Sequence, residues 1–530
     1  MINMIARLFG KIKGFIVDWG NRVSPPVFLG AAISIFAIIL YGAVWTESAG
    51  VVFNQILDFI SKYFGWYYVL IVFFFLIFVI WLYFSSYGKI RLGGDDAKPE
   101  FTRFGWFSML FAAGMGMGLI FWGVAEPIMH YAEPATAEPK SMDALREGMR
   151  FSFFHWGFHP WAIYIIFALG IAYFHFRHKL PLAPRSIFYP ILGEKIYGWI
   201  GHVIDIFCTL GTLLGVATSL GLGAMQINSG ISALAGIEYD TNIQIIIIAI
   251  ITGIAIISLV SGIHRGIQYL SMTNVVLMFC LLLFVFIAGP TLFQVNVFVT
   301  TFGNYLSQIV DTSLWIDLGA NNDWQTNWTL FYWGWWLSWC PFVGIFIARV
   351  SKGRTIREFI FYVLFIPTIA TFFWFSVFGG TAMHIEVFGV GGISEIVEDN
   401  VAMSLHALLD NLPFANITQW LGILLIIIFF ITSSDSGSLV DDMVTSGGHP
   451  NPPTGTRIFW GVTEGAAAAT LLLAGGLSAL QAASISAGLP QSIIVLISCY
   501  CLVKALNKDQ KCKGVPDVTQ LKEDLKDNKK

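Results

Sequence analysis

Apolar residues in this chain form long blocks that are separated by short polar segments. A helix that crosses a bilayer needs about 20 consecutive, mainly apolar residues. The pattern therefore predicts an all-α, polytopic membrane protein with 12 transmembrane helices. The expected spans are residues 27–46, 66–86, 104–130, 148–176, 203–231, 242–261, 271–299, 328–349, 357–380, 415–440, 457–477 and 481–504.

Charged residues alternate in sign from one connection to the next. Basic residues gather around 7–22, 89–103, 177–195, 264–265 and 349–357. Acidic residues gather around 133–138, 238–240, 311–323 and 386–399. Because cytoplasmic loops are enriched in Lys and Arg, both termini of this multi-pass membrane protein are expected in the cytoplasm. Two termini on the same side of the membrane require an even number of spans, and 12 meets this requirement.

The composition supports a membrane protein. Of the 530 residues, 56% are hydrophobic and only 12% are charged, whereas soluble domains contain about 25% charged residues. The mean hydropathy is +0.71. A net charge of −3 gives no reason to expect a nucleic-acid partner.

Glycine and proline interrupt two spans. The third contains AAGMGMG, residues Ala112–Gly118, and the eighth is broken at Cys340-Pro341. The two lie five spans apart, and an odd offset reverses orientation, so each is expected to open one half of a five-plus-five inverted repeat. Backbone unwinding is expected at Gly114, Gly116 and Gly118. The alternative is close helix packing at these glycines.

This organisation divides the chain into six parts. They are a cytoplasmic N-terminal segment (1–26), two peripheral transmembrane helices (27–103), a first repeat (104–299), an extracytoplasmic connection (300–327), a second repeat (328–504) and a short cytoplasmic tail (505–530).

Five tryptophans lie within the segment Trp328–Gly344, WTLFYWGWWLSWCPFVG. Indole faces attract quaternary ammonium groups, whereas an interfacial aromatic belt would explain only one or two tryptophans at the end of a span. In the fourth span, Trp156, Trp161 and Tyr164 project towards one side at helical spacing. With Trp336 they form a candidate box for a methylated ammonium. The alternative is that each of them fills the core.

A zwitterion also needs a site for its anionic end, and neither interrupted segment contains Lys or Arg. Backbone N–H groups at Gly114–Gly118 are expected to take that role. Hydroxyls at Thr432 and Ser433 are candidate ligands for sodium, although such side chains often bond back to the preceding turn. Asp435 is either a gate or proton relay or a solvated residue at the mouth.

Other polar residues are interpreted more simply. Glu126 is expected to be solvated near the outer end of its span. His155, His159 and His175 are expected to be core or interfacial residues without a metal.

Several segments closely resemble the betaine/choline/carnitine transporter family. They are AAGMGMGLIFWGVAEP, FHWGFHPWAIY, SLGLGA, GIQYLS, WTLFYWGWWLSWCPFVGIFIARVSKGRTIREF and FFITSSDSGS. The resemblance spans residues 25–505 and implies two LeuT-like inverted five-helix repeats after two extra helices. It also implies uptake of small zwitterions by alternating access and assembly as a homotrimer.

The resemblance also implies roles for particular residues. Substrate-binding residues would be Trp156, Trp161, Tyr164, Trp336, Met115, Gly116, Trp335 and Trp339. A sodium site would be formed by Ala112, Met115, Phe429, Thr432 and Ser433. A second sodium site matches at Thr212 and Phe342, but Val216 stands where the family has a threonine, so the stoichiometry stays open. Gly118 resembles the sodium-coupled betaine carriers rather than the proton-coupled choline carriers, which tend to have aspartate there.

The sequence thus predicts a sodium symporter for glycine betaine, with Na⁺ as coupling ion and no cofactor. Alternatives are Na⁺-independent exchange or H⁺ symport of choline or carnitine, and import of dimethylsulfoniopropionate, ectoine or trimethylamine oxide. A passive channel gated by membrane tension belongs to another class and would need a continuous pore. No convincing nucleophile–base pair indicates an enzyme.

Overall fold

The computed structural model describes residues 22–103, 105, 106, 110, 116–260, 264–318, 323–449 and 452–512. Within these ranges the regular elements are all helical, in agreement with the predicted class. The α-helices are α2 (Pro25–Val44), α3 (Thr46–Phe84), α5 (Gly116–Ala132), α6 (Met142–Trp156), α7 (Phe158–Ala172), α8 (Tyr189–Leu192), α9 (Trp199–Ala235), α10 (Thr241–Val260), α11 (His264–Ala288), α12 (Thr291–Leu314), α13 (Asp323–Gln325), α14 (Phe331–Val350), α15 (Ile356–Phe388), α16 (Ile393–Asp399), α17 (Ser404–Asp410), α18 (Ala415–Thr445) and α19 (Thr454–Cys512). Short 3₁₀ or π turns are η1 (Ser86–Lys89), η2 (Tyr173–Arg177), η3 (Pro184–Phe188), η4 (Gly193–Tyr197), η5 (Thr326–Leu330) and η6 (Val401–Met403).

Nine helical stretches of the described residues are long and apolar enough to cross a membrane, or ten if the bent pair α11 and α12 counts as one span. The long α19 contains both of the last two predicted spans, with non-helical backbone at Gly475 and Gly476. The third predicted span lies partly outside the described residues. The chain is therefore a multi-pass membrane protein, while the count of 12 and the inverted repeats stay predictions.

The predicted span 271–299 is wrong at its end. Helix α11 stops at Ala288, and α12 leaves from Thr291 at a bend of 107°. Pro290 lacks a backbone N–H and its ring obstructs the preceding turn, which favours a helix end at this position. The connection expected at 300–327 therefore begins inside helix α12.

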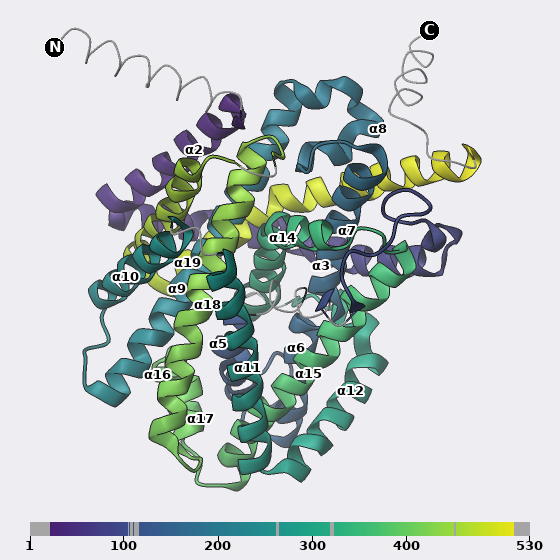
Figure 1. Ribbon diagram of the computed structural model, residues 1–530. Helices are drawn as coiled ribbons and strands as arrows, with labels where there is room; N and C mark the ends of the chain where they lie inside the picture. The colour runs from purple at the N-terminus through teal and green to yellow at the C-terminus, as the bar shows by residue number, and fades with distance from the viewer. Residues whose placement is uncertain are drawn as a thin grey trace, which may run out of the picture.

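One basic loop segment and one acidic helix lie at opposite ends of the molecule (Figure 1). The basic segment that contains Arg185 and Lys195 surrounds α8, at the same end as the start of α2. The acidic helix α16, with Glu395 and Asp399, lies at the other end with α17. This separation is what opposite sides of a bilayer require.

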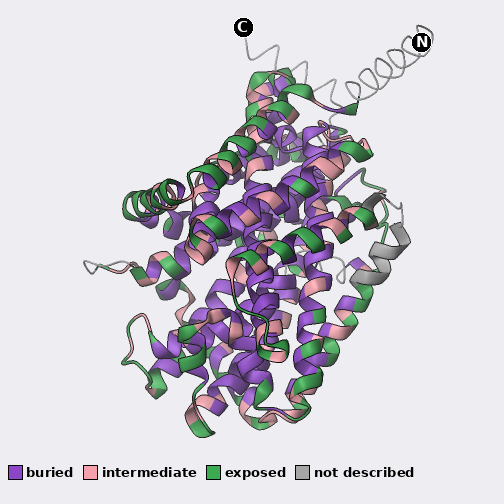
Figure 2. Ribbon diagram, turned by 90° about the vertical axis from the view of Figure 1, so that its left-hand side faces the viewer, coloured by how far each residue is buried: buried purple, intermediate pink, exposed green. Residues whose placement is uncertain are grey.

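Burial separates central from peripheral helices (Figure 2). Helix α2 exposes Leu29, Ile33, Phe36 and Leu40, which share one face and suit contact with lipid. Helices α7 and α14 are instead buried on nearly all sides, as expected for apolar helices at the centre of a bundle. The aromatic-rich segments therefore lie in the core.

Candidate substrate and ion sites

The fourth predicted span is broken at Gly157, between α6 and α7. Pro160 cannot donate a hydrogen bond to the carbonyl of Trp156, and its ring would clash with that carbonyl in a continuous helix. Gly157 is required at the break, because a Cβ there would lie 2.5 Å from the Phe153 carbonyl oxygen and 2.7 Å from the Tyr305 hydroxyl. The break leaves Trp156 at the end of one helix and Trp161 and Tyr164 on the next.

The four rings of the predicted box come together. The Trp156 and Trp336 ring centroids are 4.9 Å apart, those of Tyr164 and Trp336 are 6.4 Å apart, and those of Trp161 and Tyr164 are 5.8 Å apart. All three pairs meet edge to face, and every ring is at most 1% exposed. The Trp336 indole N–H donates to the His155 carbonyl at 3.0 Å, which is free to accept because it lies in the last turn of α6. Indoles from two segments therefore lie together, while their role in substrate binding stays a prediction.

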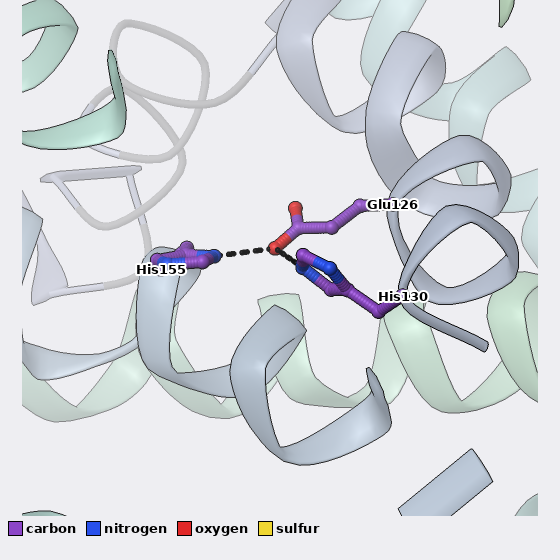
Figure 3. Close-up of side chains that lie close together, drawn as sticks. All are labelled: Glu126, His130 and His155. Carbon is purple, nitrogen blue, oxygen red and sulfur yellow. Dashed lines mark hydrogen bonds and ion pairs between the residues drawn. The ribbon is translucent and has the colours of Figure 1, made fainter. Parts of the chain in front are cut away.

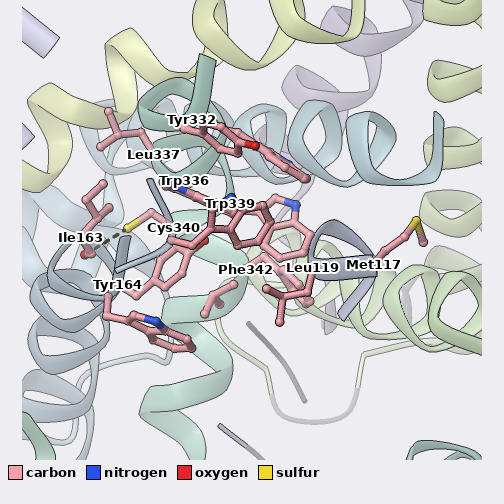
Figure 4. Packing of buried hydrophobic residues seen from close by; sticks show 14 of the residues in the cluster. Met117, Leu119, Ile163, Tyr164, Tyr332, Trp336, Leu337, Trp339, Cys340 and Phe342 are labelled. Atoms are coloured by element: carbon pink, nitrogen blue, oxygen red, sulfur yellow. Dashed lines mark hydrogen bonds between the residues drawn. The ribbon is translucent and has the colours of Figure 1, made fainter. Parts of the chain in front are cut away.

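Trp335 and Trp339 extend this cluster along α14. Figure 4 shows Trp336 and Trp339 among the packed residues of the core. Trp335 stacks on Trp336 with centroids 4.9 Å apart and planes 11° apart, and Trp339 lies 5.9 Å from Trp335. Within the described part of the chain, the buried indole nitrogens of Trp161, Trp335 and Trp339 and the Tyr164 hydroxyl have no hydrogen-bond partner. Unpaired buried donors are uncommon in folded proteins. They are available to a bound polar group.

The backbone at the glycines of the third span differs in part from the predicted unwinding. Gly116 and Gly118 lie in helix α5, so unwinding is wrong at these two positions. Gly114 lies outside the described residues. A Cβ on Gly118 would lie 2.7 Å from Trp156 Cη2 and 3.0 Å from Trp335 Cη2, and a Cβ on Gly116 would clash with the Phe429 ring. Here glycine permits close approach of aromatic rings, which was the alternative interpretation.

The predicted break at Cys340-Pro341 is also absent. Helix α14 runs without interruption from Phe331 to Val350, with Pro341 inside it. Buried helices in membrane proteins tolerate proline where neighbouring groups satisfy the backbone that it frees. Neither of the interruptions on which the repeat argument rested is therefore present in the described residues.

Glu126 is a site residue that the sequence interpretation missed. It was expected to be solvated, but its side chain is fully buried. Its Oε2 accepts hydrogen bonds from Trp156 Nε1 at 2.7 Å and from the Tyr332 hydroxyl at 2.6 Å, and its Oε1 lies 2.7 Å from His155 Nδ1. The signal was available, because an ionisable residue within an apolar span is a functional candidate by default.

Glu126, His130 and His155 also bring three potential metal-ligand atoms within 4.8 Å of one another (Figure 3). The other nitrogen of His155 contacts Thr329 Oγ1 at 3.0 Å, and both Glu126 oxygens are already bonded. This group is consequently a hydrogen-bonded support for the aromatic cluster. His159 contacts Ser313 Oγ, and His175 contacts the Leu180 carbonyl.

The described residues of the first predicted sodium site lie on α18. Thr432 Oγ1 donates back to the carbonyl of Ile428 at 2.9 Å, the bonding pattern that was left open as an alternative. A hydroxyl that donates its proton backward keeps its oxygen lone pairs for another partner. Ala112 and Met115 lie outside the described residues. Phe429 contacts Gly116, so this part of α18 lies beside the first described residues of α5.

At the second predicted sodium site, Thr212 Oγ1 is buried and has no hydrogen-bond partner within the described residues. Phe342 packs against Trp339 with ring centroids 5.5 Å apart. Helix α9 approaches α14 closely here, because a Cβ on Gly215 would lie 2.6 Å from Trp339 Cδ1. Val216 is an apolar, fully buried neighbour.

Comparison with known proteins gives a consistent assignment. The betaine/carnitine/choline family transporter model matches residues 26–511. The chain is 45% identical to the glycine betaine transporter OpuD of Bacillus subtilis, over 90% of this chain and 93% of that protein. It is 43% identical to a probable glycine betaine transporter of Desulfitobacterium hafniense, over 91% and 97%, and 44% identical to a glycine betaine/proline/choline/ectoine transporter of Vibrio parahaemolyticus, over 93% and 89%. The chain therefore belongs to the betaine/carnitine/choline family, and it is a membrane transporter and not an enzyme.

Proposed function

We propose that this protein imports glycine betaine, or a closely related quaternary-ammonium or sulfonium zwitterion, by Na⁺ symport and alternating access. The observation that carries the proposal is the dry convergence of Trp156, Trp161, Tyr164 and Trp336. Cation–π attraction is worth about 2 kcal/mol or more where water is excluded. The names of the Bacillus and Desulfitobacterium relatives support betaine over other zwitterions.

In this proposal the aromatic cluster holds the ammonium group, and the unpaired donors of Trp335 and Trp339 line the path on its other side. An ammonium sits within about 6 Å of a ring centroid. The 4.9 Å between the Trp156 and Trp336 centroids leaves no space between those two rings. Binding therefore requires the rings to separate, and substrate should change tryptophan fluorescence.

The proposed coupling ion is sodium, bound by Thr432 and Ser433 with backbone oxygens of Phe429, Ala112 and Met115. The contact between Phe429 and Gly116 supports this arrangement, since Gly116 directly follows Met115 in the sequence. A net-neutral zwitterion gains nothing from the membrane potential, whereas one Na⁺ contributes about 2.3 kcal/mol per 100 mV. That energy supports a concentration ratio of roughly 50-fold.

We further propose a bacterial plasma-membrane location, cytoplasmic termini and a homotrimeric assembly. Uptake of labelled betaine into proteoliposomes, with and without an inward Na⁺ gradient, tests the function. We expect accumulation with Na⁺ and none when K⁺ replaces it. Equal uptake in both conditions would contradict sodium coupling and favour exchange or H⁺ symport of choline or carnitine, which the same assay with those substrates would detect.

A further inference from the structure

A group of charged residues lies where α18 and α19 meet. It contains three buried carboxylates one to three turns beyond Thr432 along α18, Asp435, Asp441 and Asp442, and from α19 the buried Glu464 and the partly buried Arg457. The single cation, Arg457, pairs with Asp435 at 3.1 Å. Glu464 interacts electrostatically with Asp441, Asp435 and Arg457. The carboxylates therefore outnumber the positive charge in a region from which water is excluded.

Three of these carboxylates have oxygens without a hydrogen-bond partner among the described residues. They are Oε1 of Glu464 and both oxygens of Asp441 and of Asp442, and all three side chains are fully buried. A Cβ added to Gly437 would lie 3.1 Å from Glu464 Oε1 and 3.0 Å from Val216 Cγ2. Glu464 Oε1 thus lies beside Gly437 of α18 and Val216 of α9.

The register of α9 against α18 brings one more unpaired oxygen, from a hydroxyl, to the same level. Gly230 contacts Ile423, Gly223 contacts Phe430, and Val216 contacts Gly437. Each step of seven residues back along α9 therefore matches a step of seven forward along α18, so the two helices run antiparallel. One further turn along each helix brings Thr212 level with Asp441 on the same faces. The Thr212 hydroxyl is also buried and unpaired.

Unpaired carboxylates in a dry interior are strongly unfavourable unless a positive charge accompanies them. Carboxylate and hydroxyl oxygens are hard ligands, which suit a hard cation or a shared proton. We propose that Glu464, Asp441 and Thr212 form a second cation site, which holds one monovalent positive charge, either Na⁺ or H⁺. This inference rests on the proposed transport function. In this proposal Glu464 supplies the ligand oxygen that the Val216 side chain lacks.

The test compares Glu464→Gln and Asp441→Asn with wild type in proteoliposomes. The control is Glu395→Gln, the same chemical change at an exposed position on α16. If the site takes Na⁺, the half-saturating Na⁺ concentration for betaine uptake should rise about tenfold or more in both variants, as expected for loss of a ligand-shell group. If it takes H⁺, betaine-driven proton movement, followed with an internal pH dye, should disappear in both variants and remain in the control.

Betaine counterflow without any ion gradient separates this inference from the proposed function. Failure of counterflow in wild type would overturn the function itself. Normal counterflow with unchanged Na⁺ and H⁺ responses in both variants would overturn only the cation site.

Labelling of the wild-type protein with a hydrophobic carbodiimide provides a measurement that does not depend on the folding of variants. The site predicts modification at Glu464 or Asp441, mapped by mass spectrometry. Protection by Na⁺ would identify a sodium site, and dependence on acid pH alone would identify a proton site. Absence of modification at both residues, with exposed carboxyls labelled, would overturn the proposal.

Discussion

Trp156 Nε1 donates a 2.7 Å hydrogen bond to Glu126 Oε2 in the fully buried interior, and so links the end of α6 to the middle of α5. The same oxygen accepts from the Tyr332 hydroxyl of α14. One carboxylate therefore fixes rings from two helices around the aromatic cluster.

Replacing this carboxylate should weaken betaine binding. Glu126→Gln keeps the shape but leaves one acceptor oxygen in place of two, and hydrogen bonds to charged groups are worth about 1.5–3 kcal/mol. We expect the dissociation constant for betaine to rise at least about tenfold, measured by calorimetry on purified protein. Glu395→Gln, on the exposed face of α16, should bind like wild type. Unchanged affinity in Glu126→Gln would show that the carboxylate does not position the rings.

The close approach of the Trp156 and Trp335 rings to Gly118 gives a second prediction. A methyl group in Gly118→Ala would displace the rings of Trp156 and Trp335, and overpacking of this kind costs about 1–3 kcal/mol. Betaine binding should weaken about fivefold or more. Gly303→Ala on α12 is the matched control, because no atom lies within 4 Å of its added Cβ. Equal affinities in the two variants would contradict the ring contact.

Thr432 tests the first sodium site. Thr432→Val keeps the branched shape and removes the oxygen, so the half-saturating Na⁺ concentration for uptake should rise about tenfold. Thr463→Val is a suitable comparison, because Thr463 also bonds back to the preceding turn, at Phe459, but lies on α19. An identical Na⁺ response in Thr432→Val and wild type would remove Thr432 from the ion site.

Two separated parts of the chain are joined by the ion pair between Arg177 and Asp509, with Nε and Oδ2 2.5 Å apart. The side chains are 4% and 2% exposed, and removing one partner of a buried pair costs about 3–5 kcal/mol. Arg177→Met should therefore lower the thermal unfolding midpoint in detergent. The double variant Arg177→Met with Asp509→Leu should recover part of the loss. A single variant as stable as wild type would disprove this role.

Part of the aromatic site could be predicted from the sequence, because helical spacing brings Trp161 and Tyr164 to neighbouring positions on α7. Trp156 lies on α6, before the break at Gly157, so its place in the cluster depends on that break. Glu126 could not be assigned in this way. Its burial depends on Trp156 and Tyr332, which come from other helices. The roles of Gly116 and Gly118 were also ambiguous, since glycine permits both unwinding and close packing. Only the positions of Phe429 and Trp335 distinguish these possibilities.

The fold was predictable in class but less so in its boundaries. Apolar blocks indicated the spans, yet a continuous apolar run concealed the stop that Gly289-Pro290 imposes between α11 and α12. Conversely, Pro341 suggested a helix break, but α14 continues through this residue within the packed core. In both cases the outcome depends on packing around the proline.

Betaine binding to Trp336→Leu tests the central claim most directly. Trp336→Phe and Trp199→Leu, an exposed tryptophan on α9, serve as comparisons in titration calorimetry. Loss of a ring face worth about 0.5–2 kcal/mol predicts roughly 2- to 30-fold weaker binding in Trp336→Leu. A smaller loss is expected in Trp336→Phe and none in Trp199→Leu. Wild-type affinity in a folded Trp336→Leu protein would contradict an aromatic site for the ammonium group.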